Sequence, residues 1–137
     1  PVCLDEELDL CKKYLHIEGL RLDDRLNVEF QLETNPSDLK IPLLTLQPLL
    51  ENAIYHGVQP LPEGGTVTLN LKLEYEKIII TVTNPLSVKG RDHKAGNRIA
   101  LDNVSSRMKA IFGPEASLTA RSIEDRYITT LIYPRIP

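Results

Sequence analysis

The order of the predicted elements indicates a two-layer α/β sandwich, in which a mixed, largely antiparallel sheet is covered on one face by about three helices. Two observations carry this prediction. Five short segments have the composition of strands, and residues 25–32 and 66–73 alternate apolar and polar side chains, as half-buried strands do. Three longer segments repeat apolar residues every three or four positions, as amphipathic helices do. Because short turns join neighbouring strands into hairpins, a doubly wound parallel sheet is not expected.

Each element has a local signal. The helices are expected at Leu4–Leu22, Pro48–His56 and Ile99–Phe112, and the strands at Arg25–Leu32, Thr66–Leu73, Ile78–Asn84, Ala116–Ser122 and Tyr127–Tyr133. Acidic residues 5–7 suit the N-terminus of the first helix, where the helix dipole favours negative charge. Pro48 should interrupt any helix that starts earlier, and Gly57 should end the second helix. Residues 85–97 are polar and are expected to form a loop.

Composition excludes several classes of protein. The 137 residues, 42% of them hydrophobic and 26% charged, are typical of one globular domain. A net charge of -3 argues against nucleic-acid binding. No apolar run is long enough to span a membrane, there is no signal peptide, and a start at Pro1 suggests a fragment of a longer chain. Cys3 and Cys11 would lie about 12 Å apart along a helix, which is too far for a disulfide, so both are expected as reduced thiols.

The most informative segment is residues 47–57, on the second predicted helix. Glu51, Asn52, Tyr55 and His56 share one side of that helix, because residues three and four positions apart are neighbours. An Asn carbonyl oxygen is a suitable ligand for Mg²⁺ when phosphate oxygens complete the shell. From the spacing alone, a merely solvated polar face is the alternative interpretation.

This segment also resembles a known motif. Its run is Gln47-Pro48-Leu49-Leu50-Glu51-Asn52-Ala53-Ile54-Tyr55-His56-Gly57, preceded by Ile41-Pro42. It is similar to the N-box of the GHKL ATPases in the form found in LytS-like sensor histidine kinases, typically Gln-Pro-Leu-Val-Glu-Asn-Ala-Ile-Lys-His-Gly. Glu7-Leu8 with residues 14–18 and 21–26 resembles the family's connector, and residues 96–104 with Arg107 resemble its glycine-rich box. The resemblance implies the Bergerat ATP-binding fold, with a connector helix at 1–24 and the ATP-binding catalytic domain at 25–137.

The resemblance also implies a role for individual residues. Asn52 would bind the Mg²⁺ that bridges the ATP phosphates, and Glu51 would be catalytic, orienting the attacking histidine. The other residues expected to bind the nucleotide are Tyr55, His56, Asn84, Gly96, Arg98, Ile99, Ala100, Leu101 and Asn103. Residues 85–97 would be the ATP lid, a loop that orders over bound nucleotide.

Three positions depart from the family pattern. The usual Asp-x-Gly that recognises adenine is replaced by Asn84-Pro85, so a neutral side-chain carbonyl would accept from the adenine amino group. Losing a charge-assisted bond costs about 1–2 kcal/mol, or roughly a tenfold loss of affinity. Arg98 and Ala100 stand where glycines let the backbone approach phosphate, and Tyr55 replaces a phosphate-facing Lys.

The resemblance predicts a two-component signalling kinase. The domain would transfer the ATP γ-phosphate to a histidine on an upstream dimerisation segment outside this chain, and the phosphate would pass to a LytTR-type response regulator. The full-length protein would be a homodimer, attached through its N-terminal region to the bacterial inner membrane with this domain in the cytoplasm. This fragment alone would not autophosphorylate. Two alternatives remain open: a degenerate GHKL-fold interaction module with weak or no ATP binding, and an ATPase of the same superfamily that hydrolyses ATP.

Overall fold

The computed structural model describes residues 1–86 and 94–137, with side chains from residue 99 onward in the second stretch. Five strands form one sheet in the order β2-β4-β5-β7-β6. Their bounds are β2 (Leu26–Leu32), β4 (Gly65–Glu74), β5 (Lys77–Pro85), β6 (Ser117–Ile123) and β7 (Arg126–Pro134). β2 pairs with β4 in parallel and the other neighbours are antiparallel, which confirms the mixed, largely antiparallel sheet.

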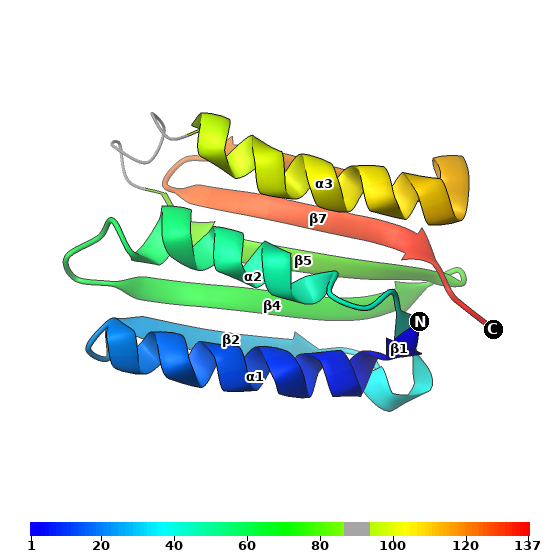
Figure 1. The fold of residues 1–137 in the computed structure, drawn as a ribbon, viewed down its shortest axis with the longest axis horizontal. Coiled ribbons are helices and arrows are strands. Elements are labelled where there is room, and N and C mark those ends of the chain that lie inside the picture. The colour runs from blue at the N-terminus through cyan, green and yellow to red at the C-terminus, as the bar shows by residue number, and fades with distance from the viewer. Residues whose placement is uncertain (87–93) are drawn as a thin grey trace.

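Three helices cover one face of this sheet (Figure 1). They are α1 (Leu4–Arg21), α2 (Leu46–Ala53) and α3 (Lys94–Phe112). α2 continues into a π-helical turn, η2 (Ile54–Val58). The arrangement confirms the predicted two-layer sandwich. None of the helices described here is long and apolar enough to cross a membrane.

The strand register decides which side chains face the helices. Leu69 of β4 lies opposite Val82 of β5, and Ile80 lies between Leu71 and Leu131, so one face of the sheet is continuously apolar. These side chains are buried together with residues of all three helices. α1 contributes Leu4, Leu8, Cys11 and Leu15 to this core. Residues 4–21 therefore pack as part of the sandwich, and the connector role of residues 1–24 stays a prediction.

Three helix boundaries were predicted wrongly. α2 begins at Leu46, so Pro48 lies within the first turn, where its missing N–H is not needed by the helix. The chain stays helical through Gly57 to Val58, so Gly57 does not end the helix. α3 begins at Lys94 rather than Ile99, and the end of the predicted lid is therefore helical. Residues 87–93 of that lid lie outside the described residues.

A small second sheet was not predicted. β1 (Val2–Cys3) pairs antiparallel with β3 (Lys40–Ile41). A single 3-10 turn, η1 (Pro36–Asp38), precedes β3. This pairing brings the start of α1 beside the segment that leads into α2.

Gly57 is needed for packing rather than for its backbone freedom. A Cβ added there would lie 2.7 Å from Cγ of Asn84, whose side chain is buried. A Cβ added at Gly19 of α1 would meet nothing within 4 Å. Gly57 thus lets the end of α2 approach β5 closely.

We expect these two glycines to respond oppositely to alanine. Gly19→Ala should raise the free energy of unfolding by about 0.5–1 kcal/mol, because alanine is the better helix former. Gly57→Ala should lower it by about 1–3 kcal/mol, because the added methyl group overpacks a buried contact. Urea unfolding of both variants measures the difference. A Gly57→Ala protein as stable as the wild type would contradict the packing role.

Candidate functional site

A groove of about 410 Å³ lies among α1, α2, η2 and the N-terminal part of α3. α2 and η2 supply most of its lining, α1 supplies one wall, and Ala100 of α3 reaches it from the other side. The lining residues are Tyr14, Glu18, Arg21, Pro48, Glu51, Asn52, Ile54, Tyr55, His56, Gln59 and Ala100. The structure therefore brings together five of the predicted site residues.

Asn52 and Glu51 differ in exposure although they are neighbours. Asn52 is buried, with 6% of its surface exposed, and lines the groove. Glu51 is exposed, and its Oε1 accepts a hydrogen bond of 2.9 Å from Nε2 of Gln47 one turn earlier. Asn52 can thus hold a ligand inside the groove, while the Glu51 carboxylate is open to a group that approaches from outside.

Tyr55 and His56 form an aromatic pair in η2. Their ring centroids lie 4.7 Å apart and the rings are nearly perpendicular, at 78°. Tyr55 is 61% exposed, whereas His56 is buried. The edge contact restrains the His56 ring at the base of the groove.

Asn84 lies at the end of β5, beneath Gly57. Its Nδ2 donates a 2.8 Å hydrogen bond to the carbonyl of Pro85, and its buried Oδ1 has no hydrogen-bond partner among the described residues. The side chain lines a separate cavity of about 370 Å³ and not the groove. Since Gly57 directly follows His56, the two sites are adjacent, and the amide presents an acceptor that lacks a donor.

The predicted residues of α3 are divided among three environments. Ala100 lies in the groove, and with Asn103 it also lines a smaller cavity of about 240 Å³ between α2 and α3. Leu101 is buried in the core, and Ile99 is 68% exposed. Gly96 and Arg98 fall in the first turns of α3, and their side chains lie outside the described residues. Their part in binding stays a prediction.

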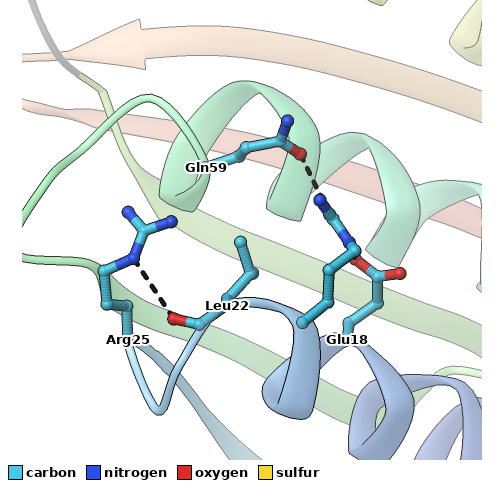
Figure 2. A network of polar contacts seen from close by, with 5 residues as sticks. Glu18, Leu22, Arg25 and Gln59 are labelled. Carbon is cyan, nitrogen blue, oxygen red and sulfur yellow. Dashed lines mark hydrogen bonds and ion pairs between the residues drawn. The ribbon is translucent and has the colours of Figure 1, made fainter.

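The wall that α1 contributes to the groove was not predicted from the sequence. Tyr14, Glu18 and Arg21 follow the four- and three-residue spacing of one helix face, which was the signal available. Arg21 donates from Nε to Glu18 at 3.0 Å and from Nη2 to Oε1 of Gln59 at 3.1 Å, which joins α1 to the residue that follows η2. Figure 2 labels Glu18 and Gln59, the two acceptors. Burial, and then the nearby Glu18 carboxylate, raise the pKa of Tyr14 to about 12, so its phenol remains a hydrogen-bond donor at neutral pH.

A second link fixes the loop that follows α2. Arg25 donates from Nε to the carbonyl of Leu22 at 3.2 Å and from Nη1 to the carbonyl of Leu61 at 2.6 Å (Figure 2 shows the first of these). The carbonyl of Arg25 accepts from the N–H of Gly65 at 3.0 Å. The end of the groove is therefore anchored to β2 and β4.

The described residues contain no group of three or more His, Cys, Asp or Glu side chains that could hold a metal ion. Asn52 is the predicted metal ligand.

Known proteins are similar in sequence to this chain over most of its length. The sensor protein LytS of Oceanobacillus iheyensis is 28% identical over 146 residues, covering 97% of this chain and 25% of that protein. The sensor histidine kinase YpdA of Escherichia coli strain K12 is 34% identical over 125 residues, covering 80% of this chain and 22% of that protein. The chain is a relative of the LytS-type sensor histidine kinases. It spans about a quarter of the length of these relatives. No protein-family model matches it.

Solved structures of histidine kinases confirm the fold of this chain. The nucleotide-free catalytic domain of histidine kinase ThkA superposes with a TM-score of 0.71 at 12% identity, covering 99% of this chain and 96% of that domain. ThkA in complex with the response regulator TrrA gives a TM-score of 0.69, covering 98% of this chain and 41% of that chain. The α/β sandwich is thus that of histidine kinase catalytic domains.

Proposed function

We propose that the chain is the ATP-binding catalytic domain of a two-component sensor histidine kinase. It binds Mg²⁺-ATP between α2 and α3 and delivers the γ-phosphate to a histidine outside residues 1–137. The observation that carries this proposal is the groove in which buried Asn52 faces Ala100 of α3 while Glu51 stands exposed at its rim.

The donor atoms present suit a magnesium nucleotide. The side-chain carbonyl of Asn52 is a hard oxygen ligand, and the phosphates of ATP would complete the coordination of Mg²⁺. The metal neutralises phosphate charge when bound. His56 and the stretch of α3 from Gly96 to Asn103 would lie along the phosphates. Gly96 is in the first turn, where unpaired N–H groups favour anions, whereas Asn103 is in the third turn and would contribute through its side chain. Tyr55 supplies a phenol at the position where the similar N-box motif has a Lys. Phosphate binding by this chain should therefore be weaker than in proteins that have the Lys.

The amide of Asn84 suits adenine. Its Nδ2 is engaged by Pro85, so the free Oδ1 can accept from an exocyclic amino group. Guanine has a carbonyl oxygen at the corresponding ring position, and two acceptors would then face each other. The domain should therefore prefer ATP to GTP.

Glu51 would act on the acceptor histidine rather than on the nucleotide. An exposed carboxylate at the rim can accept a hydrogen bond from one imidazole nitrogen and leave the other directed at the γ-phosphate. The remaining contribution of the chain is positioning, which is the main source of catalysis in phosphoryl transfer.

The partners follow from the relatives. The names of these relatives describe a sensor protein and a sensor histidine kinase, and the structural neighbour ThkA was solved with a response regulator. We infer that this chain phosphorylates an upstream histidine-containing dimerisation segment in a homodimer, and that the phosphate passes to a response regulator of the LytTR type. The full-length protein would be held at the bacterial inner membrane by its N-terminal region, with this domain in the cytoplasm.

Calorimetric titration with Mg²⁺-ATP tests the proposal. Saturable binding is expected, followed by phosphorylation of the histidine segment supplied in trans. Absence of binding up to about 1 mM, a threshold near −4 kcal/mol, would instead support the degenerate interaction module. Release of phosphate at turnover rates by the domain alone would support the hydrolase.

Base selectivity gives a second prediction. Asn84→Leu should weaken ATP binding by about tenfold and remove the preference over GTP, because the acceptor for the amino group is lost. Asn70→Leu is a matched control on the open face of the sheet, where Asn70 bonds Gln31 at 3.3 Å. Competition titrations of ATP and GTP measure both. Unchanged selectivity in Asn84→Leu would place the base elsewhere.

A further inference from the structure

Arg107 of α3 contacts the residues that precede α2. Its Nη2 donates to the carbonyl of Leu44 and to Oγ1 of Thr45, both at 2.7 Å. Thr45 Oγ1 in turn donates to the carbonyl of Pro42 at 2.7 Å. A guanidinium from one helix is thus fixed to the first residues of another.

α1 holds the same residues from the opposite side. The buried carboxylate of Glu7 accepts hydrogen bonds from the N–H groups of Leu44, of Thr45 at 3.1 Å and of Leu46 at 2.6 Å. Leu44 has a φ of 59°, a left-handed conformation that costs a non-glycine residue about 1–2 kcal/mol. Such a conformation persists only where its surroundings enforce it. Here Glu7 binds its N–H and Arg107 binds its carbonyl.

The Arg107–Thr45 contact lies two helical turns away from the groove on both helices. Asn52 lies seven residues after Thr45, and Ala100 lies seven residues before Arg107. Seven residues are close to two helical turns, so each pair lies on one face of its helix and about 10 Å apart along the axis. Thr45 meets Arg107 at one end while Asn52 and Ala100 share the groove at the other, so the two helices run antiparallel. Figure 1 shows α2 and α3 side by side over the sheet.

We propose that Arg107 is a positioning residue for nucleotide binding, which acts through Thr45 to set the separation of α2 and α3 and hence of the groups on either side of the nucleotide. This inference rests on the proposed function. Displacing α3 by a fraction of an ångström at Arg107 would misplace Ala100 and Asn103 relative to Asn52. Phosphate coordination tolerates such errors poorly, because hydrogen bonds and metal contacts weaken steeply with distance.

The test compares nucleotide affinity with stability in matched variants. Arg107→Met removes the donors and keeps the aliphatic stem, and Lys109→Met is the control on an exposed position of the same helix. We expect the dissociation constant for Mg²⁺-ATP to rise about five- to tenfold in Arg107→Met and to stay within twofold in Lys109→Met. Circular dichroism and a urea titration confirm that each variant is folded at the temperature of measurement.

Thr45 separates positioning from direct contact with phosphate. Thr45→Val keeps the shape but removes Oγ1, and should weaken binding in the same direction, while Thr45→Ser should bind within twofold of the wild type. The double variant Thr45→Val/Arg107→Met should bind more tightly than the product of the two single effects predicts, because both changes remove the Arg107–Thr45 contact, while each also removes a bond of its own, to Leu44 or to Pro42. If Arg107→Met does not fold, the threonine variants still test whether the Arg107–Thr45 contact affects nucleotide affinity.

Three results would overturn the inference. Affinity within twofold of the wild type in a folded Arg107→Met protein shows that the contact is only structural. Normal affinity in Thr45→Val with weak affinity in Arg107→Met shows that Arg107 does not act through Thr45. A wild-type chain that binds no Mg²⁺-ATP removes the proposed function, and this inference with it.

Discussion

Asn52→Ala is expected to abolish measurable Mg²⁺-ATP binding, with a dissociation constant at least about a hundredfold higher than that of the wild type. Asn52 supplies the buried carbonyl oxygen that would ligate the metal, and the groove offers no other acidic or amide side chain at that depth among the lining residues. Without it, Mg²⁺ would be bound by phosphates and water alone. Calorimetry with the folded variant measures the effect.

Two companion variants separate metal binding from transfer. Asn52→Asp keeps an oxygen ligand and should bind within tenfold of the wild type. Glu51→Gln should bind Mg²⁺-ATP within twofold, since Glu51 is exposed at the rim, yet phosphorylate the histidine segment about a hundredfold more slowly, the scale of a lost acid–base group. If Asn52→Ala binds Mg²⁺-ATP as tightly as the wild type, the metal is not held by this residue.

The predictable part of the fold follows from periodicity. Alternation in residues 66–73 identified the strand face that is buried against the helices, because side chains one residue apart point to opposite faces. The spacing of Glu51, Asn52, Tyr55 and His56 indicated that they lie together, and all four line the groove, although Asn52 and His56 are buried and not on an exposed face. These signals are local, so one sequence contains them.

What could not be predicted depends on contacts between distant residues. Gly57 appeared to be a helix stop, but its role is set by Asn84, which lies 27 positions later on β5. The early start of α2 depends on Glu7, which satisfies N–H groups near position 45 that no local side chain caps. Such contacts leave no periodic pattern. The wall formed by Tyr14, Glu18 and Arg21 was missed because an exposed polar face of a helix usually has no binding role.

The second large effect is expected at Glu7. Its side chain is buried, with 1% exposed, and replaces the missing side-chain cap at the start of α2. A carboxylate is also favoured there by the dipole of α2. Hydrogen bonds to charged groups contribute about 1.5–3 kcal/mol each, and buried donors left without a partner cost a similar amount.

Glu7→Ala should therefore lower the free energy of unfolding by about 4 kcal/mol, a large part of the roughly 5–15 kcal/mol typical of a domain. Three N–H groups, those of Leu44, Thr45 and Leu46, would lose their acceptor, and Leu44 would lose a contact that maintains its left-handed backbone. Glu7→Gln should cost about half as much, because the amide oxygen can still accept.

The neighbouring exposed Glu6 is the control, and Glu6→Ala should change stability by less than about 0.5 kcal/mol. Urea unfolding of the three variants measures the series. If Glu7→Ala were no less stable than Glu6→Ala, α2 would not depend on α1 for its N-terminal cap.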